Sequence, residues 1–209
     1  MKHILIHGLG QGASSWDGVT SFLEETIDID CPELFALPSG SAVTYIDLYQ
    51  AFSDRYENYT EPLCLCGLSL GGIISLNYAI DHTLKVQSLV LIGTQYKIPK
   101  TIMKLQNAIF RFLPKSYFDR IGLAKKDVIG LADSMLDLDF SRELASISCP
   151  TLIVCGGKDS ATMKASKTLS DNIPNAKLRV IEGAGHMVNE SHAETLASLL
   201  QAFHSNELA

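Results

Sequence analysis

A serine between two glycines is the first feature of this chain that could do chemistry. Ser69 lies in the segment Gly67-Leu68-Ser69-Leu70-Gly71, which follows a short apolar run and precedes a stretch whose apolar residues have helical spacing. At the apex of such a strand-to-helix turn a serine hydroxyl is exposed, and the glycines two residues away on either side remove Cβ atoms that would clash. We therefore predict that Ser69 is a nucleophile.

A serine hydroxyl is a poor nucleophile near neutral pH, so it needs an imidazole to take its proton and a carboxylate to orient that imidazole. Of the six histidines, only His186 lies in the glycine-containing loop directly after the last predicted strand. Asp159 follows the preceding strand, whereas Glu182 comes too close before the loop to reach round it. We predict that His186 is the base and Asp159 the acid. A simple helix-cap role for Asp159 stays open.

A glycine loop at residues 7–12 follows the first predicted strand and lets backbone N–H groups face a ligand. It lacks the lysine of a phosphate-binding P-loop, so we do not expect a nucleotide there. His7 starts this loop, and we expect it to hold the loop rather than to act as a base. The other four histidines are expected to be structural or on the surface: His3, His82, His192 and His204.

Strand and helix patterns alternate along the chain. Mainly apolar runs predict strands at residues 2–7, 63–66, 86–92, 151–155 and 177–181, and an alternation of apolar and acidic residues predicts another strand at 27–34. Helical spacing predicts helices at 14–25, 42–57, 73–80, 162–172 and 190–204. This alternation is typical of an α/β fold with a mostly parallel sheet of about six strands flanked by helices. Ser69, Asp159 and His186 all fall at the carboxyl edge of that sheet, where such folds bind ligands.

Residues 95–147 carry no convincing strand pattern, so we predict a helical cap inserted between two core segments, 1–94 and 148–209. Within it, residues 95–126 hold eight basic residues and one acidic residue. A solvated lysine-rich helix face is the commoner cause of such a charge run, and steering of an anionic substrate or contact with an anionic membrane surface are the alternatives. The apolar residues of the cap could form an acyl or small aromatic pocket or simply pack its helices: Ile98, Met103, Phe110 and Phe112.

Composition limits the number of domains and the classes of function that this chain could have. With 209 residues, 46% of them hydrophobic, the chain can bury one good core and is expected to be a single domain. A net charge of −6 argues against general nucleic-acid binding, and no apolar stretch is long enough for a membrane span or a signal peptide. The five cysteines are odd in number and mostly lie in apolar runs, which predicts free thiols in the cytoplasm. No spacing typical of a metal site is present.

These motifs together resemble the α/β-hydrolase superfamily along nearly the whole chain. The resemblance rests on the glycine loop with Trp16, the GLSLGG turn at 67–72, the segment from Cys149 to Asp159, and Gly183-Ala184-Gly185-His186. It implies Ser69, Asp159 and His186 as a catalytic triad, no cofactor, and an oxyanion hole formed by the N–H groups of Leu9 and Leu70. The family's usual antiparallel strand pair before the glycine loop has no counterpart here. That leaves open whether the sheet edge is bare or covered by a partner subunit, as in a homodimer.

The expected reaction is hydrolysis of a small carboxylic ester through an acyl-enzyme on Ser69. A serine at the turn argues against the dehalogenase and epoxide-hydrolase branches, which need a carboxylate nucleophile. Relatives with the same triad also hydrolyse thioesters, cleave carbon–carbon bonds or eliminate a carboxylate-bearing leaving group, and the basic cap would suit such anionic substrates. In a different class of function, the fold serves as a small-molecule binding or interaction module with little turnover.

Overall fold

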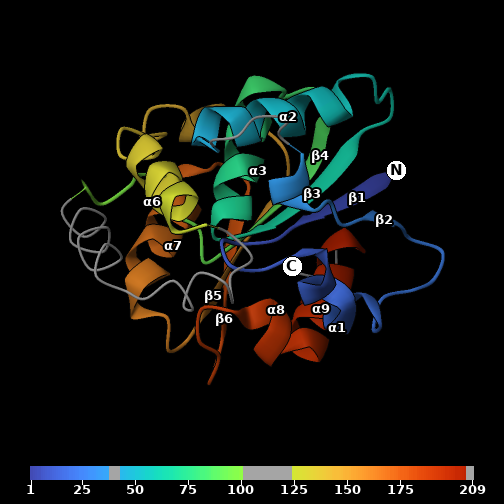
Figure 1. Ribbon diagram of the computed structural model, residues 1–209. Coiled ribbons are helices and arrows are strands. Elements are labelled where there is room, and N and C mark those ends of the chain that lie inside the picture. The colour runs from blue at the N-terminus through green and yellow to red at the C-terminus, as the bar shows by residue number, and fades with distance from the viewer. Residues whose placement is uncertain (38–42, 101–123, 206–209) are drawn as a thin grey trace.

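A computed structural model describes residues 1–37, 43–100 and 124–205 of the chain. All neighbouring strands pair in parallel within one six-stranded sheet, in the order β2-β1-β3-β4-β5-β6 (Figure 1). The strands are β1 (Lys2–Ile6), β2 (Asp28–Asp30), β3 (Leu63–Leu68), β4 (Val86–Ile92), β5 (Thr151–Gly156) and β6 (Ala176–Ile181). The predicted six-stranded α/β sheet is confirmed. A partner subunit at the β2 edge stays a prediction.

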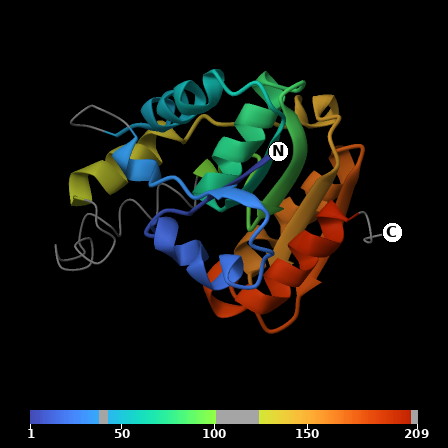
Figure 2. The ribbon, with the colours of Figure 1, turned by 90° about the vertical axis from the view of Figure 1, so that its right-hand side faces the viewer.

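Helices cover both faces of this sheet (Figures 1 and 2). One face carries α2 (Tyr45–Glu57), α3 (Leu70–Asp81) and α7 (Ser160–Asn172), and the other carries α1 (Asp17–Thr20), α8 (Val188–Ser191) and α9 (Ala193–His204). The remaining described helices are α6 (Lys125–Ser134) and the 3-10 turns η1 (Ala13–Trp16), η2 (Leu34–Ala36) and η3 (Leu144–Ser146). Among the described residues, no helix is both long and apolar enough to cross a membrane.

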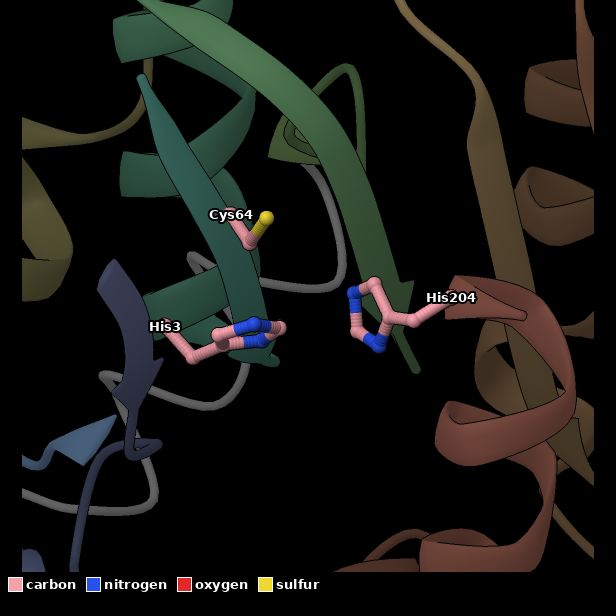
Figure 3. A group of neighbouring side chains, drawn as sticks. All are labelled: His3, Cys64 and His204. Atoms are coloured by element: carbon pink, nitrogen blue, oxygen red, sulfur yellow. The ribbon is translucent and has the colours of Figure 1, made fainter. Parts of the chain in front are cut away.

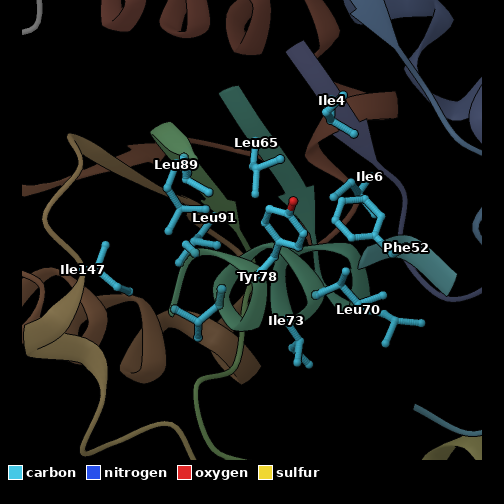
Figure 4. Close-up of a cluster of buried hydrophobic side chains, with 14 of the residues drawn as sticks. Ile4, Ile6, Phe52, Leu65, Leu70, Ile73, Tyr78, Leu89, Leu91 and Ile147 are labelled. Carbon is cyan, nitrogen blue, oxygen red and sulfur yellow. The ribbon is translucent and has the colours of Figure 1, made fainter. Parts of the chain in front are cut away.

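The core lies on both sides of the sheet because successive strand residues point to opposite faces. On β4, Leu89 and Leu91 pack toward α3 in the cluster drawn in Figure 4, whereas Val90 and Ile92 pack toward α9. All four side chains have no exposed surface. This nearly continuous apolar strand is the pattern of a parallel strand covered on both faces.

Two predicted helices differ from their expected bounds: the first is shorter, and the last is divided in two. The first was expected at 14–25, but it forms only η1 and α1, because the hydroxyls of Thr20 and Ser21 bond the carbonyls of Asp17 and Gly18 one turn earlier. Such back-bonding competes with helix continuation. The last was expected as one helix and is divided into α8 and α9 at His192, whose backbone φ of −139° is not helical.

The described part of the segment 95–147 carries α6 and η3, and its lysines are partly paired. Lys97 lies 2.5 Å from Asp139, and Lys100 lies 2.5 Å from Asp137. Both pairs are largely exposed, so each contributes little to stability. They nevertheless reduce the local excess of positive charge that the sequence suggested. Met103, Phe110 and Phe112 lie outside the described residues, and the cap as a unit stays a prediction.

The glycines at the turn after β3 allow helix α3 to begin close to β1 and β3. A Cβ on Gly71 would collide with the carbonyl oxygen of Ile6, and a Cβ on Gly67 would collide with that of Gly71. We expect Gly71→Ala to lower the free energy of unfolding by at least about 3 kcal/mol, because backbone atoms would have to move. Gly130→Ala in α6 is the matched control, since nothing lies within 4 Å of its added Cβ.

Urea unfolding of the two variants checks this prediction. Gly130→Ala is expected to raise the free energy of unfolding by about 0.5–1 kcal/mol, the ordinary gain from alanine within a helix. If both glycine variants unfolded at the same urea concentration, the close approach of α3 to β1 would not be what requires glycine at position 71.

Candidate active site

Ser69 is the single residue between β3, which ends at Leu68, and α3, which begins at Leu70. Its backbone has φ 54° and ψ −112°, and among the described residues it is the only non-glycine with positive φ. The conformation is strained for an L-residue. It is held by the Ser69 N–H, which donates to Ile92 O at 2.8 Å, and by the Ser69 carbonyl, which accepts from Ile73 N at 3.0 Å.

Asp159 and His186 are in direct contact. The Nδ1 of His186 lies 2.7 Å from Oδ2 of Asp159. Asp159 is buried, with only 6% of its surface exposed. Asp159 also caps α7, because its carboxylate accepts from the hydroxyl of Thr162 at 2.5 Å and from the Thr162 N–H at 3.3 Å. The structure therefore places Asp159 both at the start of a helix and against the imidazole. Thr162 is a partner that the sequence reasoning missed, although an Asp three residues before a Thr at a helix start is a recognisable signal.

Burial alone would raise the pKa of Asp159, but hydrogen bonds from Thr162 and His186 outweigh it and leave the pKa below its ordinary value. The acid is therefore ionised at neutral pH. An ionised carboxylate only accepts hydrogen bonds, so Nδ1 of His186 carries the proton and Nε2 is left as the basic nitrogen.

Ser69 and His186 line one cavity of about 360 Å³. Leu9 and Leu70 also line it, and its walls are mostly apolar: Ile73, Ile98, Pro99, Leu131, Ala132 and Met135. The structure thus brings Ile98 to the pocket, together with three residues of the α6 region that the sequence did not single out. The ring of His186 lies over Gly93, where a Cβ would approach it to 3.0 Å and where φ is +54°.

The glycine loop is held by buried side chains. His7 has no exposed surface, its Nε2 accepts from Leu34 N at 3.0 Å, and its Nδ1 lies 3.0 Å from Gly8 O. Gln11 accepts from Gly8 N at 3.1 Å and donates to Glu190 at 2.7 Å, which links the loop to α8 just after His186. His7 thus makes the loop contacts expected of it. The role of Gln11 was missed, because nothing local marks a partner that is 179 residues away.

Residues 4–199 match the model of the alpha/beta hydrolase family. The chain belongs to this family. As an α/β hydrolase it is an enzyme, and its six parallel strands with helices on both faces are the arrangement that the resemblance implied.

Among curated relatives of this α/β hydrolase is the pimeloyl-(acyl-carrier protein) methyl ester esterase of Aromatoleum aromaticum, which is 24% identical over 95% of this chain and 96% of the relative. Another is the 2-hydroxy-6-oxononadienedioate/2-hydroxy-6-oxononatrienedioate hydrolase 2 of Pseudomonas putida, 25% identical over 96% of this chain and 86% of the relative.

Two solved structures share the fold at low sequence identity. A thermophilic esterase from Thermogutta terrifontis with bound malate matches with a TM-score of 0.82 at 18% identity, over 99% of this chain and 90% of that one. MenH from S. aureus matches with a TM-score of 0.82 at 15% identity, over 100% of this chain and 95% of that one. At such identities these matches establish the fold of the α/β hydrolase.

Asp159→Asn is expected to lower kcat by roughly 10³- to 10⁴-fold, because an amide favours the wrong tautomer of His186. It also changes the pH dependence of stability. A carboxyl whose pKa is lowered by folding stabilises the fold above its unfolded pKa, about 4, and that contribution is lost as pH falls through the folded pKa. Urea unfolding between neutral and acidic pH should show a smaller loss for the variant than for the wild type.

The matched control for this prediction is Asp171→Asn, an exposed residue of the same helix. It should retain both the activity and the wild-type pH dependence. Equal turnover by Asp159→Asn and the wild type would mean that Asp159 serves only as a helix cap.

Proposed function

We propose that Ser69, His186 and Asp159 form a catalytic triad that hydrolyses a small carboxylic ester through an acyl-enzyme. The observation that carries the proposal is the shared cavity. It holds Ser69 in its strained turn together with a histidine whose Nδ1 contacts a buried carboxylate at 2.7 Å. A serine-hydrolase site is recognised by a nucleophile beside a base that is itself oriented by an acid, and these three residues fit those roles.

In the first half of the reaction, Nε2 of His186 takes the hydroxyl proton as Ser69 Oγ attacks the ester carbonyl. The imidazolium that forms is stabilised by Asp159, and the negative charge on the carbonyl oxygen is stabilised by the N–H groups of Leu9 and Leu70. Leu70 is also the first residue of α3, so the positive end of the helix dipole faces the same oxygen. Collapse of the tetrahedral intermediate expels the alcohol, which takes the proton from His186.

In the second half, water attacks the acyl group on Ser69 while His186 takes one of its protons. The carboxylic acid leaves and the proton returns to Ser69 Oγ, so one ester and one water give one acid and one alcohol. No cofactor takes part in these steps. His186 thus acts first as a general base and then as a general acid in each half of the reaction.

The apolar walls of the cavity favour a short acyl chain or a small aromatic group, which would lie against Ile98, Leu131 and Met135. The Aromatoleum relative is named for a methyl ester, which agrees with ester cleavage. Lys97 and Lys100 are each paired with an aspartate, so they are less available to attract an anionic substrate.

Cleavage of a carbon–carbon bond in an anionic substrate is the second candidate function. It is favoured by the Pseudomonas relative, which is named as a hydrolase of a dioate. Thioester hydrolysis and lyase chemistry would use the same triad. For the cell compartment we propose the cytoplasm, because all five cysteines are free thiols in the structure.

A substrate panel tests the proposed reaction. We would compare kcat/KM for p-nitrophenyl esters of increasing acyl length with kcat/KM for acyl-CoA thioesters and for dicarboxylate substrates of carbon–carbon hydrolases. The proposal predicts the highest value for short-chain or small aromatic esters. Faster turnover of a dicarboxylate or a thioester would favour the second candidate. Turnover of none, with a ligand bound in the cavity, would favour a binding protein.

A further inference from the structure

Two histidines and a cysteine meet at the end of the sheet opposite the candidate active site. His3 on β1 and Cys64 on β3 are paired directly in the strand register, and His204 is the last residue of α9. One ligand atom from each lies within 4.8 Å of the other two. Figure 3 shows the three side chains projecting into the same space from three different elements.

The atoms gathered there suit a zinc ion. Zn²⁺ binds thiolate sulfur at about 2.3 Å and imidazole nitrogen at about 2.0–2.1 Å in tetrahedral geometry, which separates neighbouring ligand atoms by roughly 3.5 Å. The ligand atoms of His3, Cys64 and His204 lie at most 4.8 Å apart, so side-chain shifts of about 1 Å would bring them to the spacing that the ion needs. Among the described residues, no carboxylate belongs to this cluster, so a hard cation such as Mg²⁺ or Ca²⁺ is not favoured.

The surroundings provide access and room for a fourth ligand. His3, Cys64 and His204 all line a cavity of about 520 Å³. Water in this cavity could complete the tetrahedron. Sδ of Met1 lies 3.2 Å from Cys64 Sγ, but a thioether is not among the ligands that zinc sites use.

Packing of the two rings accounts for only part of this arrangement. His3 and His204 touch edge to face, with ring centroids 4.6 Å apart, but this ring contact does not involve the Cys64 thiol, whose sulfur lies within 4.8 Å of a nitrogen of each ring. A hydrophobic contact would not require two imidazoles and a thiol at one point.

We propose that His3, Cys64 and His204 bind a zinc ion that ties the C-terminal helix to the amino end of the sheet. Cys64 is five residues before Ser69 along β3, about 17 Å at the rise of a strand, so the ion does not take part in the reaction at Ser69. Binding releases the thiol proton of Cys64 to solvent and forms one zinc–sulfur and two zinc–nitrogen bonds. The site is structural and independent of the proposed esterase activity.

Metal titration of the untagged protein tests the site directly. After treatment with a chelator and removal of it, Zn²⁺ is added in competition with a chromophoric chelator, and Co²⁺ is added separately while its absorption is recorded. We expect one ion per chain and a thiolate-to-cobalt charge-transfer band. Cys64→Ser should abolish that band, and His204→Gln should weaken Zn²⁺ binding by at least roughly 10-fold.

Matched controls are a buried cysteine and a histidine elsewhere in the fold. Cys149→Ser and His82→Gln should retain wild-type affinity and the cobalt band. His204 is exposed, so His204→Gln does not threaten the fold and keeps the test valid even if Cys64→Ser unfolds. Absence of stoichiometric binding, or undiminished binding by His204→Gln, would overturn the proposal.

Thermal unfolding provides a second readout. Because the ion binds only the folded chain, Zn²⁺ at 100 times its Kd should raise Tm by roughly 5–10 °C. At the same Zn²⁺ concentration that rise should fall to about half or less in His204→Gln, whereas ester turnover should be the same with and without Zn²⁺. A loss of turnover on zinc removal with no change in Tm would contradict a structural role at this end of the sheet.

Discussion

Ser69→Ala is expected to lower kcat for a p-nitrophenyl ester by roughly 10⁴-fold or more. The variant keeps the Cβ and the strained turn but has no atom to form the acyl-enzyme, so only transition-state stabilisation by the oxyanion hole and substrate binding would remain. Its free energy of unfolding should stay close to that of the wild type. Steady-state kinetics together with urea unfolding would separate a catalytic loss from a folding defect.

Ser75→Ala is the matched control, because Ser75 is a buried serine on α3, the helix that follows Ser69, and its hydroxyl donates to Gly71 O at 2.8 Å. Its loss should cost about 1 kcal/mol of stability and leave turnover near the wild-type value. Full ester turnover by Ser69→Ala would show that another group is the nucleophile.

His186→Gln should produce a loss of similar size, roughly 10⁴-fold or more in kcat, because the described lining of the cavity holds no other base to take the Ser69 proton. Glutamine can still donate a hydrogen bond to the carboxylate of Asp159, so the buried acid keeps a partner and the fold should survive. Steady-state kinetics measure the loss. Combined with Ser69→Ala, the second substitution should add little, because the two side chains act as a unit.

His192→Gln is the control for this variant. His192 lies six residues further on, at the junction of α8 and α9, and its Nδ1 contacts only the neighbouring Ser191 hydroxyl among the hydrogen bonds described. It should retain wild-type turnover. A His186→Gln enzyme that was as active as His192→Gln would remove the imidazole from the proposed mechanism.

Local sequence patterns predict much of this fold. Five of the six strands follow from mainly apolar segments that end one or two residues before a glycine. The GLSLGG turn marks the start of α3 because no side chain other than hydrogen fits at Gly67 and Gly71. Ser69, Asp159 and His186 could be selected together because each follows a strand of one parallel sheet, which places them at one edge.

Other features depend on contacts that local patterns do not contain. The link from Gln11 to Glu190 forms only when the glycine loop meets α8, and no glycine or proline near His192 marks the division of the last helix. The cluster of His3, Cys64 and His204 spans nearly the whole sequence and has no motif spacing. Strand register and the end of α9 bring its residues together, so sequence rules for metal sites miss it.

Labelling with a fluorophosphonate is the sharpest test of the proposed triad. Such a probe reacts with a serine hydroxyl only where a base and an oxyanion hole activate it. The triad predicts one adduct per chain, mapped by peptide mass spectrometry to Ser69, with labelling lost in Ser69→Ala and slowed by several orders of magnitude in His186→Gln. An unlabelled wild-type protein, or an adduct on a different residue, would contradict it.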